Sequence, residues 1–202
     1  MFMLIIKKEV NDMDSTLPPI LFSNRLVLRS YCVGDERWYF KMSQRNRAHL
    51  ERYEPENPVM AIKTEEDAKK IITEFVNEWK KGSHHFMGVF LKEPEQFVAQ
   101  LYIGLVDRNV NEFGIGYFSD VEHDGKGYVT EAVNTVVKSL FEILNAHRIR
   151  IETDDTNVRS IGVAERCGFV REGHIRENKK NPDGTYSGTL YYGLLKSDFH
   201  SR

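Results

Sequence analysis

The sequence predicts an α/β (α+β) fold, with helices on the faces of a central mixed, mostly antiparallel sheet of about seven strands. Strand-like and helix-like stretches alternate along the chain without internal repeats or low-complexity linkers. Residues 129–144 carry apolar side chains at the 3.6-residue spacing of an amphipathic helix, and such elements pack in layers around a shared core. With 202 residues, 41% of them apolar, the chain suffices for one good core, so we expect a single domain.

The N-terminal half of the domain is expected to hold three strands and two helices. Leu26 and Leu28 are separated by one residue and flanked by arginines, as in a half-buried strand. Thr64, with Asp67 three residues later, predicts a capping box at the start of a helix. The expected elements are strand 25–31, helix 34–52, a proline-containing loop 53–58, helix 64–79, and strands 84–91 and 97–106.

The C-terminal half is expected to continue with the amphipathic helix and to end in a hairpin. Gly168 stands where a glycine commonly ends a helix, and a Pro-Asp-Gly turn separates the last two strands. The expected elements are strand 113–118, helix 129–144, strand 147–154, a short helix within 157–168, and hairpin strands 169–178 and 189–199.

Charge and cysteine content exclude several function classes. The net charge of −2, with both signs spread along the chain, gives no basic footprint, so we expect no direct nucleic-acid partner. Cys32 and Cys167 are too few and too far apart for a disulfide framework or a zinc site, and they indicate reduced thiols in a cytoplasmic protein. The apolar run MFMLII is short and lacks a basic flank, so residues 1–20 are expected to form an N-terminal arm or an extra strand before the domain, 21–202. No membrane segment is expected.

Gly125, Lys126 and Gly127 lie between a predicted strand and the amphipathic helix. The free N–H groups and the positive dipole end of a helix N-terminus attract anions, and glycine lets a ligand approach the backbone. DGKGYVT is therefore a candidate diphosphate cradle, with Lys126 adding charge at its rim. A tight connection without a ligand is the alternative. The spacing fits neither a Walker P-loop, because Lys126 is followed by glycine, nor the Rossmann fingerprint.

A second signal lies downstream, where ETDDTNVRSIGVAERCGF places Asn157 and Ser160 one helical turn apart at the opening of a helix. Together with GKGYVTEAV, this segment resembles the GCN5-related N-acetyltransferases (GNAT), in the branch similar to bacterial ribosomal-protein N-terminal acetyltransferases (RimJ/RimL-like). RLVLR, LERYEPENP, IGYF and the YYGLL ending fit as well, so the resemblance covers nearly all of 21–199. It implies the GNAT fold, with a splay between the fourth and fifth strands, and an acyltransferase activity.

The resemblance implies acetyl-CoA as cosubstrate, with its pantetheine arm paired to the exposed strand edge in the splay. For the implied catalytic residues Asn157 and Ser160, placed near the pantetheine and the sulfur, an ordinary helix cap is the alternative. Asp124 departs from the family pattern and is expected to repel a diphosphate mildly. The residues implied to contact acetyl-CoA are Tyr117, Phe118, Ser119, Asp124, Gly125, Lys126, Gly127, Tyr128, Val129, Thr130, Asn157 and Ser160.

The implied reaction is direct acetyl transfer from the thioester to an amine, with no metal and no covalent enzyme intermediate. A backbone N–H near Phe118 is the expected donor to the oxyanion, and Ser160 is expected to hydrogen-bond the sulfur. The sequence also departs from the family at two positions that bear on proton transfer: Ala164 stands where many relatives have a tyrosine that acts as the acid, and Gly114 stands where the family often has a glutamate. Glu112, on the same strand face as Gly114, is the substitute base we expect; a solvated strand-end carboxylate is the alternative.

The acceptor amine is the least defined part of the reaction. The loop YEPENP is expected to overhang the acceptor side, where Tyr53, Glu54 and Glu56 would bind the substrate. With Asp154 and Asp155, these glutamates would attract a protein N-terminus or a small amine such as a polyamine. Solvated loop charges are the alternative reading.

A second function stays open at this point. The replacements at Gly114 and Ala164 are also compatible with a degenerate member that binds an acyl-CoA without turnover, as a sensor or partner module. An enzyme would release free CoA with some amine, whereas a sensor would not. The sequence leaves monomer and homodimer both open.

Overall fold

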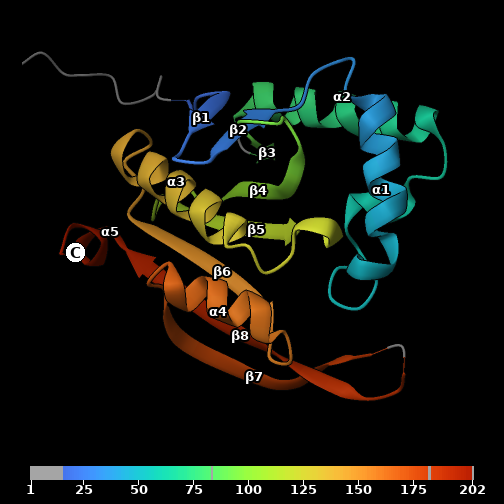
Figure 1. Cartoon of the computed structure of the whole chain (residues 1–202). Helices are drawn as coiled ribbons and strands as arrows, with labels where there is room; N and C mark the ends of the chain where they lie inside the picture. Colours follow the sequence, from blue (N-terminus) through green and yellow to red (C-terminus); the bar gives the residue numbers. More distant parts are fainter. Residues whose placement is uncertain (1–15, 83, 182, 202) are drawn as a thin grey trace, which may run out of the picture.

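The computed structural model describes residues 16–82, 84–181 and 183–201 and shows one eight-stranded sheet with helices on both faces (Figure 1). The strands lie in the order β1-β2-β3-β4-β5-β6-β8-β7, and only the pair β5 and β6 is parallel. The strands are β1 (Ile20–Phe22), β2 (Leu26–Ser30), β3 (His84–Leu91), β4 (Phe97–Asp107), β5 (Glu112–Ser119), β6 (Arg148–Asp154), β7 (Val170–Lys180) and β8 (Tyr186–Leu195). The predicted mixed, mostly antiparallel sheet is confirmed, with eight strands instead of about seven.

The additional strand is β1, an edge strand of three residues. It pairs antiparallel with β2, with Ile20 opposite Arg29. Leu17, just before β1, is already buried in the core, so the chain packs against the domain before residue 21. The run MFMLII lies outside the described residues, and the arm or strand predicted for it stays a prediction.

The helices agree with the predicted ones in number and place, apart from short additions. Thr64 and Asp67 form the predicted capping box: Asp67 N donates to Thr64 Oγ1 at 3.1 Å and Thr64 N donates to Asp67 Oδ2 at 3.0 Å. The strand predicted up to residue 199 is wrong beyond Leu195, where a short helix replaces it. The helices are α1 (Glu36–Leu50), η1 (Pro58–Ala61), α2 (Glu65–Lys81), η2 (Val121–His123), α3 (Tyr128–Glu142), α4 (Val158–Arg166) and α5 (Lys196–His200).

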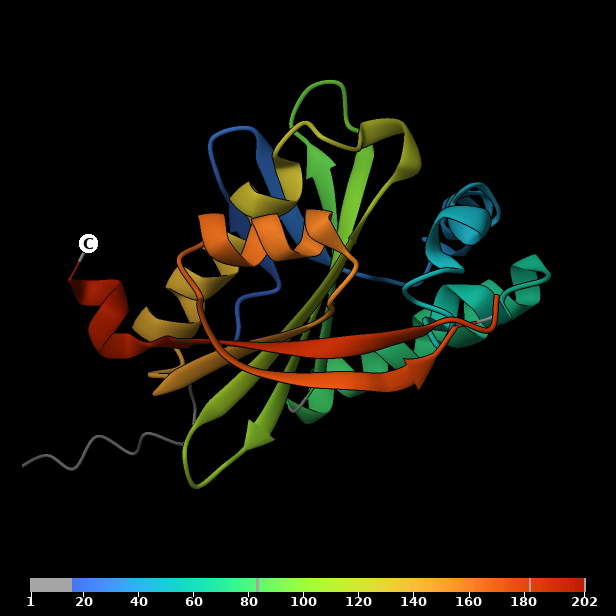
Figure 2. The same cartoon turned by 90° about the horizontal axis from the view of Figure 1, so that it is seen from below.

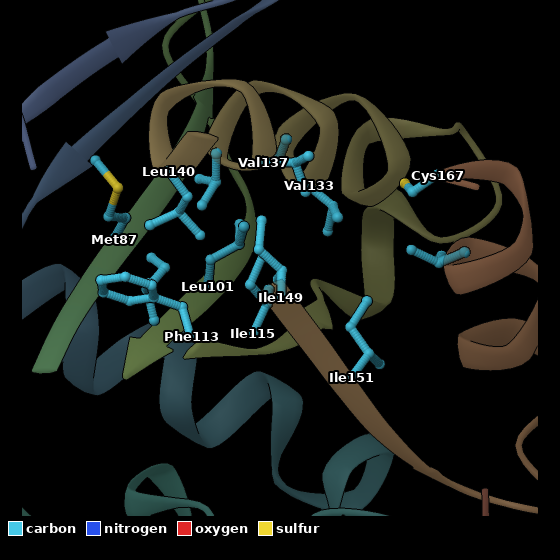
Figure 3. Close-up of a cluster of buried hydrophobic side chains, with 14 of the residues drawn as sticks. Met87, Leu101, Phe113, Ile115, Val133, Val137, Leu140, Ile149, Ile151 and Cys167 are labelled. Atoms are coloured by element: carbon cyan, nitrogen blue, oxygen red, sulfur yellow. The ribbon is translucent and has the colours of Figure 1, made fainter. Parts of the chain in front are cut away.

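Two apolar cores lie on opposite faces of the sheet. Along β3, Met87 and Val89 belong to the core under α3, whereas Phe86 and Phe90 belong to the core under α1 and α2, because successive strand residues face opposite sides. Figure 2 shows α3 and α4 on one side of the sheet and α1 and α2 on the other. The predicted stripe of α3 is confirmed: its buried apolar residues are Ala132, Val133, Val136, Val137, Leu140 and Phe141. Figure 3 shows three of them facing the sheet, namely Val133, Val137 and Leu140.

The strands β5 and β6 separate after a short paired stretch. Only Glu112–Gly114 pair with Arg148–Arg150. Beyond them β5 continues along β4 to Ser119, while β6 continues along β8 to Asp154. The predicted splay is therefore confirmed, and the two strand edges that face it have no strand partner in the described part of the chain. No helix in that part is long and apolar enough to cross a membrane.

Candidate active site

The splay widens into a cleft of about 1610 Å³. Its walls come from the loop between α1 and η1, the far end of β5, the turn and first residues of α3, the end of β6 with the start of α4, and the end of β7. Residues from both halves of the sheet line this cleft, which lies where β5 and β6 part (Figure 1).

The turn before α3 presents bare backbone to this cleft. Gly125 and Gly127 have φ angles of +73° and +77°, in the left-handed region that favours glycine. A Cβ on Gly125 would meet no atom of the described chain within 4 Å, and Gly127 caps α3 without a side-chain hydrogen bond. The first N–H groups of α3 are therefore accessible to an anion.

Arg25, at the entry to β2, holds this turn in place. Its Nη1 donates to the Lys126 carbonyl at 3.2 Å, and its guanidinium lies 4.6 Å from the ring centroid of Tyr128. Its Nε pairs with Glu131 Oε2 at 2.6 Å. Burial acts to raise the pKa of Glu131, but hydrogen bonds from Ser23 and Arg25 outweigh it and the pKa is lowered. Arg25 was not among the predicted site residues. The sequence feature that could have indicated it is its place as one of the arginines that flank Leu26 and Leu28 in the predicted strand 25–31.

Asp124 lies among hydrogen-bond donors from three elements. Its carboxylate accepts from the Ser119 hydroxyl in β5 and from Arg159 in α4, and His49 Nε2 of α1 lies 3.8 Å from Asp124 Oδ2. Arg159, also missed by the prediction, brings a positive charge that offsets the repulsion expected between Asp124 and a diphosphate.

Ser160 and Tyr117 meet inside the cleft from opposite sides of the splay. The Tyr117 hydroxyl donates to the Ser160 carbonyl at 3.1 Å and lies 3.1 Å from Ser160 Oγ. Burial, the largest cause, raises the pKa of Tyr117, so its hydroxyl stays protonated and available as a donor. Asn157 Oδ1 accepts from Ser160 N at 3.2 Å, so Asn157 caps α4, and its predicted place beside the pantetheine stays a prediction.

The backbone from Tyr117 to Ser119 lies on the free edge of β5, past its last pair with β6. Tyr117 and Phe118 point to opposite faces of the strand. The Phe118 ring is buried in the core under α1 and α2, so only its backbone is placed to serve a ligand in the splay.

Glu112 is not among the residues that line the cleft. It begins β5 at the end where β5 and β6 still pair, and its Oε1 accepts from Arg148 Nε at 2.9 Å. Arg148 Nη1 also donates to Glu172 Oε1 at 2.7 Å, which makes a network of three charged groups. Because a general base must reach the amine, this placement argues against the role predicted for Glu112.

The loop between α1 and η1 brings Tyr53, Glu54 and Glu56 to the cleft. The Tyr53 hydroxyl donates to the Thr156 carbonyl at 3.3 Å, which ties the loop to the segment before α4. Glu54 is half-buried and accepts from Asn57 Nδ2 at 3.2 Å. Burial raises the pKa of Glu54, and Asn57 offsets this in part.

Asp154 and Asp155 are already engaged within the protein. Asp154 accepts from Ser187 Oγ at 2.6 Å and from the N and Oγ1 atoms of Thr156 at 2.9 and 2.7 Å. Asp155 Oδ2 lies 2.8 Å from His174 Nε2. These contacts fix the end of β6 to the β7–β8 hairpin, and they leave the two aspartates less able to attract a substrate than predicted.

The cleft combines a helix N-terminus that is open to an anion, a free strand edge beside it, and hydroxyl groups and a carboxylate further along. This arrangement suits a long phosphorylated carrier and a second substrate that meets its far end, so the site is that of a group-transfer enzyme. A family model described as an acetyltransferase (GNAT) domain matches residues 25–170. The chain belongs to this family of acetyltransferases.

This chain is similar to other acetyltransferases, among them two relatives in sequence and one solved structure. The probable N-acetyltransferase YjcK of Bacillus subtilis (strain 168) is 35% identical over 136 residues, 67% of this chain and 75% of that protein. The spermidine N(1)-acetyltransferase of Vibrio cholerae is 39% identical over 81 residues, 40% of this chain and 46% of that protein. The fold is similar to that of RimL, a ribosomal L7/L12 alpha-N-protein acetyltransferase solved with coenzyme A, with a TM-score of 0.78 at 18% identity, covering 90% of this chain and 98% of that one.

Proposed function

We propose that this protein is an acetyl-CoA-dependent N-acetyltransferase that transfers the acetyl group directly to a primary amine, in the cytoplasm. The observation that carries the proposal is a single cleft that runs from the bare N-terminus of α3 to the Ser160–Tyr117 pair and the Glu54 loop. A carrier such as acetyl-CoA has a diphosphate at one end and a thioester at the other. Its site therefore needs N–H groups for the diphosphate and polar side chains beside the thioester.

The residues of the cleft fit acetyl-CoA. The N–H groups from Gly125 to Thr130 would hold the diphosphate, and the open space above Gly125 lets it approach the backbone. Lys126 and Arg159 supply positive charge at the rim. The free edge of β5 at 117–119 would pair with the pantetheine arm as an added strand does. When bound, acetyl-CoA supplies an acetyl group already activated as a thioester.

The chain's own groups would act on the reacting atoms in three ways. The cleft would hold the amine and the thioester carbonyl in attack geometry, which is worth up to about 7–11 kcal/mol. The backbone N–H of Phe118 would donate to the carbonyl oxygen as its negative charge develops. Ser160 Oγ would donate to the sulfur as the thiol departs, while Tyr117 fixes the position of Ser160.

Two acceptor classes are supported. The similarity of the fold to RimL supports a protein α-amine, and the segment shared with the spermidine N(1)-acetyltransferase supports a small amine. The alternative to an enzyme with turnover is an acyl-CoA sensor, which Gly114 and Ala164 keep under consideration.

The test is thiol release from acetyl-CoA over a panel of N-terminal peptides, polyamines and amino acids. Acetyl-CoA binding is measured in parallel by the shift of the thermal midpoint. We expect saturable binding and release with one amine class. Binding without release on any amine would instead favour the sensor, and the absence of binding would refute the diphosphate cradle.

A further inference from the structure

We infer that Glu54 binds the acceptor amine and takes its proton, so that Glu54, and not Glu112, is the general base. This inference rests on the proposed acetyl transfer. It gives Glu54 a role in proton transfer, which its location on the acceptor side does not by itself imply. It follows from the state of the carboxylates in the cleft, the place of the loop, and the demands of the reaction.

Elimination among the acidic residues points to Glu54. Asp124 and Asp154 each accept hydrogen bonds from at least two other residues. Glu152 is exposed and pairs with an arginine of its own strand at 3.1 Å, and Glu56 is exposed. Among the described residues, Glu54 is the half-buried carboxylate of the cleft with a single hydrogen-bond donor, whereas a carboxylate offers about four acceptor positions. The carboxylates that line the cleft are Glu54, Glu56, Asp124, Glu152 and Asp154.

The loop places Glu54 beside the reacting end of the cleft. Its neighbour Tyr53 is bonded to the carbonyl of Thr156, one residue before Asn157, whose side chain caps the N–H of Ser160. Glu54, Tyr117 and Ser160 line the same cleft, and the Tyr117 hydroxyl lies 3.1 Å from Ser160 Oγ. Glu54 therefore lies near the Ser160–Tyr117 pair, where the thioester of a bound cosubstrate would be.

The environment of Glu54 suits proton transfer. Burial raises the pKa of Glu54 towards the range in which a general base works best. Lys179 also lines the cleft, and its charge offsets part of the rise in the pKa of Glu54, but the two form no ion pair among the described residues. A carboxylate in this state can receive an ammonium group as its hydrogen-bond partner.

The proton balance is complete without another reactant. An acceptor ammonium gives one proton to a Glu54 carboxylate oxygen, which passes it to solvent. The neutral nitrogen then forms a bond to the acetyl carbon while the carbon–sulfur bond breaks. The nitrogen loses its second proton to solvent through the same Glu54 carboxylate, and the departing thiolate, which accepts a hydrogen bond from Ser160 Oγ, takes up one proton from solvent, so that one proton is released in all.

The test compares Glu54→Gln with Glu51→Gln, a matched change at an exposed residue of the same region that does not line the cleft. We expect Glu54→Gln to lower kcat about 100-fold, which is the lower end of the effect of a general base. KM for acetyl-CoA and the thermal shift it produces should stay at wild-type values, whereas Glu51→Gln should leave both rate and binding unchanged.

The pH profile separates a base from a structural role. In the wild type, kcat should fall as pH drops through the raised pKa of Glu54, since protonation removes the base. Glu54→Gln should lose this acid limb, and Glu54→Asp should retain it at an intermediate rate. A Glu54→Gln enzyme with wild-type kcat and an intact acid limb would overturn the inference while leaving the proposed function standing. A wild type that binds acetyl-CoA and turns over no amine would overturn both.

Discussion

At the scale of single residues, the Tyr117 hydroxyl is the group that joins the two sides of the splay at the proposed sulfur site. Tyr117→Phe removes a hydroxyl that lies 3.1 Å from both oxygens of Ser160, and it keeps the ring. We expect kcat to fall about 10-fold, as the loss of a hydrogen bond of about 1.4 kcal/mol implies, because Ser160 loses its positioning contact. KM for acetyl-CoA should change little.

Steady-state kinetics with both substrates varied measure this effect. Tyr186→Phe serves as control, because Tyr186 is exposed and does not line the cleft. If Tyr117→Phe changes KM for acetyl-CoA and leaves kcat intact, Tyr117 acts in cosubstrate binding and not at the sulfur.

Asp120 is the buried charge that fixes α1 to the segment after β5. Arg45 Nη2 donates to Asp120 Oδ2 at 2.6 Å and Asn46 Nδ2 donates to the same oxygen at 2.8 Å. Burial acts to raise the pKa of Asp120, but hydrogen bonds from Asn46, Arg45 and His123 outweigh it and the pKa is lowered. A lowered folded-state pKa means that ionised Asp120 stabilises the fold above its ordinary pKa, and that this contribution is lost as pH falls through the lowered value.

Asp120→Ala should therefore lower the free energy of unfolding by about 3 kcal/mol at neutral pH, since Arg45 and Asn46 both lose their bonds to the buried carboxylate. Urea unfolding at neutral pH and in acid measures the difference, which should shrink in acid. Glu74→Gln, at an exposed position of α2, should change stability by less than about 0.5 kcal/mol. An equal loss for Asp120→Ala at all pH values would contradict the ionic explanation.

At the scale of elements, two glycine variants distinguish the cost of backbone strain from the cost of blocking a ligand at the turn before α3. Gly125→Ala and Gly34→Ala both place a Cβ at positive φ, +73° and +108°, with no atom of the described chain within 4 Å. Both should cost about 1–2 kcal/mol of stability. Only Gly125→Ala should weaken acetyl-CoA binding, by about 10-fold or more in calorimetric titration, because only its Cβ stands in the proposed diphosphate site. Equal affinities in the two variants would place the diphosphate elsewhere.

Elements with a strong local signal could be predicted from the sequence, and those set by tertiary contacts could not. The start of α2 is determined by the local capping box of Thr64 and Asp67, and α3 is indicated by the 3.6-residue spacing of its own apolar residues. The three residues of β1 are too few to show alternation, and residues 196–199 read as the end of a strand although the chain turns into α5.

The candidate site divides in the same way. The glycine turn and the Asn157 cap are local, and both were predicted. Which of Glu112 and Glu54 is placed to act as the general base depends on where β5 and β6 part and on how the loop after α1 folds back. The contact of the Tyr117 hydroxyl with α4 depends on the same tertiary arrangement. Neither follows from spacing along the chain.

At the scale of the whole molecule, the sheet consists of two parts with little direct pairing. In the described part of the chain, strands β1 to β5 pair with strands β6, β8 and β7 only along Glu112–Gly114. Other links across the splay include Tyr53 with Thr156, Tyr117 with Ser160, and the packing of α3 on α4. A ligand in the cleft would contact both parts, so binding should couple them.

Saturation with acetyl-CoA should therefore stabilise the folded protein and do so unevenly. At 100 times its Kd a ligand contributes about 2.7 kcal/mol, which for a chain of this size corresponds to a rise in Tm of roughly 5–10 °C. Hydrogen exchange should slow most at the free edge of β5, the first turn of α3 and the start of α4, and least at β1 and β2, which lie at the far edge of the sheet. Because a ligand bound elsewhere would also raise Tm, the exchange pattern is decisive: protection centred away from the splay would contradict the proposed site even if the protein were stabilised.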